Sequence, residues 1–307
     1  MDVTEAGDAF WAFVASDIPR FPTGYSLDDT CGMIAQRELG LMLARSAVGK
    51  STWMLNVIRA SQDVPTVVFN MEMSARMQFE WLVAMTFCED LDISADDLES
   101  VARNPRDPRH EALVTTRRAM HYRYPALNFE QFDESPTVDS LARLVDAIEQ
   151  KRGIRPQRVF IDHLSLMKGC RDYEGLTRTG ALLHTWAMED DLAVIAIQQA
   201  GRTGGSDGGR NDGHVPTTIS SGVYGGEDAA DWIWGMYQPQ KDPKFAKLSQ
   251  RFAMEAKKYE ALALEYEEVR GVTRLQVVKN RMNGNTNLTG VKLRYDRRTR
   301  QLREERG

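Results

Sequence analysis

The segment Ala44–Ser51, ARSAVGKS, decides the fold of this chain of 307 residues. It departs from the phosphate-binding pattern G-x-x-x-x-G-K-[ST] only in its first position, where alanine replaces glycine. The apolar run before it (38–44) and the segment PTVVFNME (65–72) predict buried strands, and TWMLNVIRASQ (52–62) predicts a helix between them. A phosphate-binding loop requires this order of strand, loop, helix and strand. We therefore predict a nucleotide site despite Ala44.

The predicted loop can bind ATP and Mg²⁺. Alanine in first position is costly only where the backbone must adopt a positive φ, so we expect ordinary geometry at Ala44. Lys50 would contact the β- and γ-phosphates, Ser51 would ligate Mg²⁺, and the N–H groups of 46–51 would surround the phosphates. The nucleotide-binding set is Ala44, Arg45, Ser46, Ala47, Val48, Gly49, Lys50, Ser51 and Thr52. The alternative is a chance G-K-S between a strand and a helix.

Composition restricts the class of protein. With 42% hydrophobic and 27% charged residues, the chain is typical of soluble globular proteins. Its net charge of −5 provides no global basic field, so any nucleic-acid contact must come from a local surface. The three cysteines form neither a metal spacing nor a disulfide framework, and no signal peptide or membrane span is recognisable. We expect a cytoplasmic protein without membrane contact.

The remaining pattern predicts an α/β fold. Strands that alternate with helices favour a mainly parallel sheet with helices on both faces, followed by a C-terminal β-hairpin with a tight turn at NGN (283–285). We expect a short N-terminal linker helix and connector in 1–19 and one ATPase domain in 20–307. The predicted helices are 4–16, most of 74–126, 137–153, 176–191 and much of 240–268, and the further strands are 158–167 and 192–199.

Two acidic residues are predicted at strand ends, where open α/β sheets bind ligands. Asp162 follows the apolar run RVFI and would complete the magnesium shell in a Walker-B arrangement. Glu72 would activate water, and it would lie beside the phosphate loop if the two strands are neighbours. Alternatively, Glu72 is an acid at the start of a helix capped by Ser74. Gln199 at the next strand end either senses the γ-phosphate or is a polar terminus.

Together these segments resemble the DnaB-type replicative helicases, ring-forming RecA-like ATPases, over nearly all of 18–300. FPTGYSLDD (21–29) is similar to the family's entry motif I-x-T-G-x-x-x-L-D, and ARSAVGKST resembles its loop A-R-P-x-x-G-K-T, in which the first alanine is usual. VVFNMEMSARMQ resembles the FSLEMS segment, VFIDHLSLM the Walker-B strand, and AVIAIQQAGR the sensor strand.

The resemblance implies roles for further residues. It places the catalytic base at Glu72 and the γ-phosphate sensor at Gln199. VVKNRMNGNTNLTGVKLRYD is similar to the family's C-terminal motif, in which Lys279 and Arg281 would reach into the next subunit's ATP site. An arginine finger stabilises charge on the γ-phosphoryl oxygens and makes hydrolysis depend on assembly. Without the resemblance, Lys279 and Arg281 would be a solvated strand face.

The chain departs from the family pattern in several places. Ser46 replaces the loop proline, and His163 replaces a tyrosine. From Gly222 onward, the residues differ from those of the corresponding family motif. In the family, a helical N-terminal domain organises the ring and meets primase; here we expect only the 4–16 helix before the ATPase segments. The aromatic residues of the predicted 4–16 helix would pack either on an adjacent subunit or on their own domain.

Two glycine-containing segments, 168–180 and 201–221, are predicted loops at the sheet edge that could hold a DNA strand by its phosphates. The alternative is a flexible loop without function. The candidate DNA-binding residues are Lys168, Arg171, Arg178, Arg202 and Arg210.

We therefore expect an ATP-dependent DNA helicase that acts on single-stranded DNA as a hexameric ring during replication, with a primase or helicase loader as a possible partner. Gln199 would report the γ-phosphate to the 201–221 loop. A RecA/RadA-like recombinase or annealing mediator that forms filaments is the main alternative. A non-enzymatic loader or regulator is the third.

Overall fold

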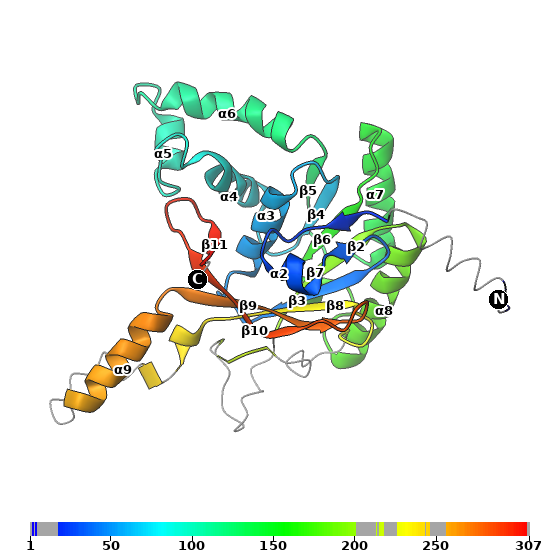
Figure 1. The fold of residues 1–307 in the computed structure, drawn as a ribbon. Coiled ribbons are helices and arrows are strands. Elements are labelled where there is room, and N and C mark those ends of the chain that lie inside the picture. The colour runs from blue at the N-terminus through cyan, green and yellow to red at the C-terminus, as the bar shows by residue number, and fades with distance from the viewer. Residues whose placement is uncertain are drawn as a thin grey trace.

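The computed structural model describes residues 18–200, 226–242, 244–245 and 256–305, together with 2, 4, 213 and 215–217. The predicted helix at 4–16, apart from Thr4, therefore lies outside the described residues. So does most of the predicted loop at 201–221. The described chain forms a large sheet with helices on both faces, as expected (Figure 1).

The main sheet has the strand order β11-β10-β9-β8-β3-β7-β6-β4-β5. The six strands from β8 to β5 are parallel, and β9, β10 and β11 continue the sheet in antiparallel fashion. The mainly parallel sheet and the C-terminal hairpin are thus confirmed. The strands are β3 (Leu39–Ala44), β4 (Thr66–Asn70), β5 (Leu127–Gln131), β6 (Arg158–Asp162), β7 (Ala193–Gln199), β8 (Trp232–Tyr237), β9 (Val272–Asn280), β10 (Asn287–Tyr295) and β11 (Leu302–Glu304).

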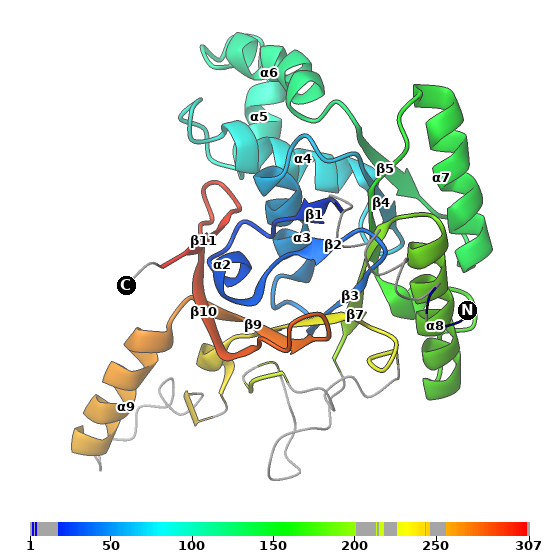
Figure 2. The same cartoon turned by 45° about the vertical axis from the view of Figure 1, so that its right-hand side comes forward.

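Helices cover both faces because the strands are apolar on both (Figure 2). One core includes Trp53 of α3 and Leu82 of α4, and the other includes Val145 of α7 and Leu183 of α8. The helices are α2 (Leu27–Cys31), α3 (Lys50–Ala60), α4 (Ala75–Phe87), α5 (Leu98–Arg103), α6 (His110–Arg123), α7 (Val138–Arg152), α8 (Tyr173–Glu189) and α9 (Ala256–Val269), with short 3-10 turns η1 (Leu164–Leu166) and η3 (Pro239–Lys241). Short strands β1 (Arg20–Phe21) and β2 (Ile34–Ala35) pair separately.

The sequence predicted the ends of helices best where it contains a recognisable capping residue. Thr137 caps α7 with a reciprocal bond to Ser140, and Gly153 ends it in the left-handed conformation. The signal at Asp172 was missed: its carboxylate accepts the N–H of Gly175 and starts α8 at Tyr173. The predicted 168–180 loop is therefore helical from Tyr173 onward. The edge strand β5 was also missed, since its short polar sequence LNFEQ carries little strand signal.

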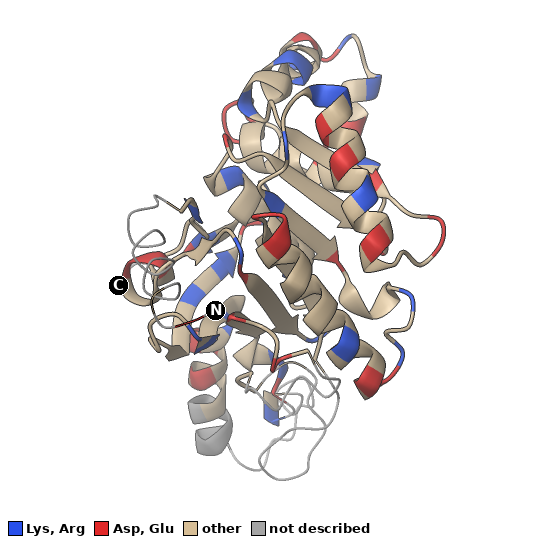
Figure 3. Cartoon of the chain, turned by 90° about the vertical axis from the view of Figure 1, so that its right-hand side faces the viewer, with Lys and Arg blue, Asp and Glu red and all other residues tan. Residues whose placement is uncertain are grey.

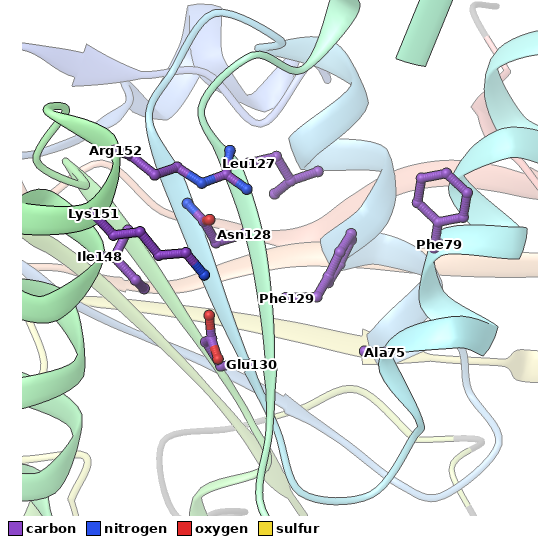
Figure 4. Close-up of a pocket in the computed structure, with 9 residues that line it drawn as sticks. All are labelled: Ala75, Phe79, Leu127, Asn128, Phe129, Glu130, Ile148, Lys151 and Arg152. Carbon is purple, nitrogen blue, oxygen red and sulfur yellow. The ribbon is translucent and has the colours of Figure 1, made fainter. Parts of the chain in front are cut away.

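Two surface features lie away from the predicted nucleotide site. A hollow of about 370 Å³ lies at the free edge of β5, between α4 and α7 (Figure 4). Phe79 and Phe129 line it on the α4 side, and Lys151 and Arg152 contribute from α7. None of the predicted site residues lines this hollow. On the side shown in Figure 3, acidic and basic residues are interspersed along the helices.

Candidate nucleotide-binding site

The phosphate loop joins the end of β3 to the start of α3, as the sequence predicts. Ala44 is an ordinary residue of β3, and its carbonyl accepts the Ala200 N–H at 3.0 Å. Two later positions do have a left-handed backbone: Gly49 with φ of 108° and Ala47 with φ of 57°. The alanine that needs explanation is therefore Ala47, since a side chain is disfavoured in this region.

Neighbouring segments hold the loop from two sides. The amide of Gln199, at the end of β7, donates to the Ser46 hydroxyl at 2.7 Å. From η3, Lys241 Nζ donates to the Ala47 carbonyl at 3.0 Å. Lys241 was not among the predicted site residues, because it is distant in sequence and has no motif of its own. Gln199 thus lies against the phosphate loop from the end of β7.

Three predicted residues, Lys50, Ser51 and Asp162, lie close together where the loop enters α3. Ser51 Oγ donates to Asp162 Oδ2 at 2.8 Å, and Lys50 Nζ donates to the Arg45 carbonyl at 3.1 Å. Lys50 is largely buried, and this burial lowers the pKa of its ammonium group. Asp162 is fully buried at the end of β6, and burial raises its pKa to about 6.

Ser51 and Asp162 fit a magnesium ion. The second carboxylate oxygen of Asp162 is buried and has no hydrogen-bond partner among the described residues. A hydroxyl and a carboxylate are the oxygen donors that Mg²⁺ takes when most of its shell comes from water and phosphates. The described part of the chain contains no cluster of three His, Cys, Asp or Glu side chains, so a metal cage made wholly of such residues is not present there.

The position of Glu72 corrects one expectation. Its strand β4 is not a neighbour of β3, because β7 and β6 lie between them, and β4 ends two residues before Glu72. Register instead pairs Asn70 with Asp162, so Glu72 lies beyond the Walker-B strand. Its carboxylate is 57% exposed and 3.6 Å from His163 Nε2. The charge of Glu72 also acts on the pKa of Asp162 and of Lys50.

The alternative role for the Glu72 region is partly confirmed, because Ser74 does cap α4 by accepting the Met77 N–H. His163 is the neighbour that sequence reasoning did not use. Its Nδ1 lies 2.7 Å from the Ser165 hydroxyl, which orients the ring toward Glu72. Burial lowers the pKa of His163, and so does the charge of Lys50.

Lys279 and Arg281 lie at the opposite end of the sheet from the phosphate loop. In register, Trp232 of β8 pairs with Gly40 at the start of β3 and with Asn280 at the end of β9. The whole of β3, about 17 Å of strand, therefore separates this pair from the loop of the same subunit. Neither side chain can act on a nucleotide bound to its own chain.

The candidate DNA-binding residues are only partly described. Lys168 and Arg171 are exposed after η1, and Arg178 is exposed on α8. Arg202 and Arg210 lie outside the described residues.

The profile of the DnaB-like helicase C-terminal domain family matches residues 21–304. The chain belongs to this family. Two solved structures share its fold: the ATPase domain of G40P, and a DnaB-like replicative helicase described with its interactions with primase. The first has a TM-score of 0.75 at 17% identity and covers 99% of both chains. The second has a TM-score of 0.71 at 17% identity, over 98% of this chain and 66% of the other.

Curated proteins gave no match to the sequence of this DnaB-like chain. No helix among its described residues has the length and apolarity to cross a membrane. Family and fold together indicate a nucleotide-binding ATPase domain of the helicase type.

Proposed function

We propose that this chain hydrolyses ATP between neighbouring subunits of a ring-shaped hexamer and uses the energy to move along single-stranded DNA and unwind duplex DNA during replication. The observation that carries the proposal is the division of the site. The Ser51–Asp162 pair lies at one end of the sheet and Arg281 at the other. Each subunit would thus supply half of two different sites, which requires assembly.

In the proposed reaction, Lys50 holds the β- and γ-phosphates, and Ser51 and Asp162 hold Mg²⁺. The bound ion would neutralise charge on the phosphate oxygens. Glu72 orients a water molecule and takes its proton as the oxygen attacks the γ-phosphorus, and ADP leaves. Arg281 and Lys279 of the neighbouring subunit stabilise the charge on the transferred group. Gln199, which donates to Ser46, would report the state of the loop to residues 201–221.

DNA would contact Lys168, Arg171 and Arg178 together with the 201–221 segment that holds Arg202 and Arg210. Residues 20–307 would form the ATPase domain, and 1–19 a linker that reaches a neighbouring subunit. A primase or a helicase loader is the proposed protein partner. The family's work in replication favours a cytoplasmic location.

Strand displacement on forked DNA with a 5′ or a 3′ tail tests this function. The wild-type protein should show ATPase activity stimulated by single-stranded DNA and should unwind one of the two forks, whereas Lys50→Ala should do neither. Lys151→Ala removes an exposed lysine of α7 and should behave as the wild type. Gln199→Ala should hydrolyse ATP with reduced stimulation by DNA.

Two results would contradict the proposal. Electron microscopy that shows long filaments on single-stranded DNA, without unwinding, would favour a recombinase or annealing mediator. Absence of DNA-stimulated hydrolysis at all concentrations would favour a loader or regulator.

A further inference from the structure

Asp231 is a buried carboxylate at the end of the sheet opposite the nucleotide site. It is 4% exposed and lies just before β8, between the start of β3 and the end of β9. Its Oδ2 accepts the Leu39 N–H at 2.9 Å and lies 3.2 Å from Nε2 of His184. Its Oδ1 lies 3.3 Å from Nη1 of Arg281. One carboxylate thus joins β3, α8 and the basic side chain that follows β9.

Backbone carbonyls near Asp231 also hold Arg281 and the neighbouring basic residue Lys279. The Asp231 carbonyl accepts the Arg281 N–H at 2.8 Å, and the Asp228 carbonyl accepts from Arg281 Nη2 at 2.6 Å. Lys279 Nζ donates to the Glu227 carbonyl at 2.7 Å. The Arg281 side chain nevertheless remains 46% exposed. Its guanidinium is therefore held on one side and open on the other.

Helix α8 makes this support rigid. A Cβ on Gly180 would lie 2.9 Å from Cα of Gly226, so the turn that leads to Asp231 rests directly on the helix backbone. His184 is one turn further along α8 and reaches Asp231. Asp231 itself is fixed by the Leu39 N–H. The contacts from β3 and α8 thus hold the carboxylate in place beside the Arg281 guanidinium.

We propose that Asp231 is a positioning residue for Arg281, which it orients toward the nucleotide of the neighbouring subunit. This inference rests on the proposed function of Arg281. A free arginine loses much side-chain entropy on being ordered, and a fixed carboxylate meets that cost before the nucleotide arrives. Because catalysis is sensitive to misplacement of about 1 Å, a loosened Arg281 slows turnover without weakening ATP binding at Lys50.

Asp231→Asn is the first test, because the amide keeps an oxygen for the Leu39 N–H and removes the charge beside Arg281. We expect kcat for ATP hydrolysis to fall about 10- to 100-fold, with KM for ATP unchanged within about twofold. Asp190→Asn is the matched control. Its carboxylate pairs with Arg155 at 3.0 Å and with Trp186, so its loss should leave both constants unaltered.

Subunit mixing separates positioning from structure. Asp231→Asn subunits keep an intact phosphate loop, and Lys50→Ala subunits keep an intact Asp231–Arg281 pair. Mixing the two should restore activity at the interfaces where the intact halves meet. A mixture of Arg281→Ala and Lys50→Ala subunits is the reference. In a separate double variant, adding Asp231→Asn to Arg281→Ala should cause no further loss of kcat.

Each outcome has one meaning. If neither mixture recovers activity, the proposed division of the site between subunits fails. If only the Arg281→Ala mixture recovers, the inference about Asp231 is overturned and the proposed function stands. A rise in kcat for Asp231→Asn would also overturn it, because Asp231 would then sequester Arg281.

A second pair of variants keeps the inference testable if Asp231→Asn does not fold. His184→Ala removes one contact of Asp231 and should lower kcat about 2- to 10-fold. His184→Gln keeps a donor at a similar reach and should recover most of that loss. Equal losses in both variants would contradict the positioning role.

Discussion

The two ends of the central sheet differ in what surrounds their charged groups. At the phosphate-loop end, Asp162 is buried, one of its oxygens has no partner among the described residues, and burial raises its pKa to about 6. At the other end, Asp231 is equally buried, but both of its oxygens have partners. An unsatisfied buried carboxylate is suited to take a ligand, and a satisfied one is suited to hold a neighbour in place. The two ends of the sheet are thus suited to different roles: Asp162 to binding a ligand, and Asp231 to holding Arg281 in place.

The largest expected effect comes from removing the Arg281 side chain, at the end of the sheet opposite the phosphate loop. Arg281→Ala should lower kcat about 10³-fold or more, because an arginine finger supplies stabilisation of this size and the remaining Lys279 lacks the planar guanidinium. ATP binding, measured by titration of a fluorescent analogue, should be retained. Arg294→Ala removes an exposed arginine of β10 and should have little effect. A normal turnover rate for Arg281→Ala would show that the two ends work independently.

Glu72→Gln tests the near end at the step of water activation. We expect kcat to fall about 10²-fold or more, while ATP and Mg²⁺ still bind. Steady-state hydrolysis and equilibrium nucleotide binding measure the two effects. Glu80→Gln, on α4, is the control and should leave hydrolysis unaltered. Loss of ATP affinity in Glu72→Gln would assign this residue to binding instead.

The pKa of Asp162 makes stability depend on pH. Its folded value of about 6 exceeds the ordinary value of 3.8, so the folded protein binds this proton more tightly than the unfolded chain does. The free energy of unfolding of the nucleotide-free protein should therefore fall as pH rises from about 4 to about 6, by about 3 kcal/mol from this group. Asp162→Asn should remove that part of the slope. Denaturant unfolding in metal-free buffer over this pH range measures it, and parallel curves would contradict the assignment.

The smallest expected effect distinguishes the two alanines of the loop. Ala47→Gly should increase the free energy of unfolding by about 1 kcal/mol, because Ala47 has a left-handed backbone. Ala44→Gly should decrease it by about 0.5–1 kcal/mol, because glycine loses more conformational freedom than alanine when it is fixed in a strand. Thermal unfolding of the two variants measures both. Changes of the same sign would refute this account of the loop.

The fold was largely predictable because its strongest signals are local. Apolar runs predicted β3, β4, β6 and β7, and the Thr137 and Gly153 caps predicted the limits of α7. The loop motif predicted that Lys50 and Ser51 lie at the start of a helix, as they do in α3, and the predicted strand end at Asp162 lies within hydrogen-bond distance of Ser51. Weak local signals failed, as at β5, where a half-buried edge needs few apolar residues.

What the sequence determined by itself was the chemistry: a phosphate loop, an acid at a strand end and a basic pair near the C-terminus. Only the tertiary structure decided where these groups lie. Crossover connections put β7 and β6 between β3 and β4, so Glu72 follows a strand that pairs with the Asp162 strand and not with the strand that precedes the loop. Antiparallel pairing of β9 on β8 carries Arg281 away from the loop and onto Asp231. The order of strands in a sheet depends on long-range pairing and packing, which no local pattern records.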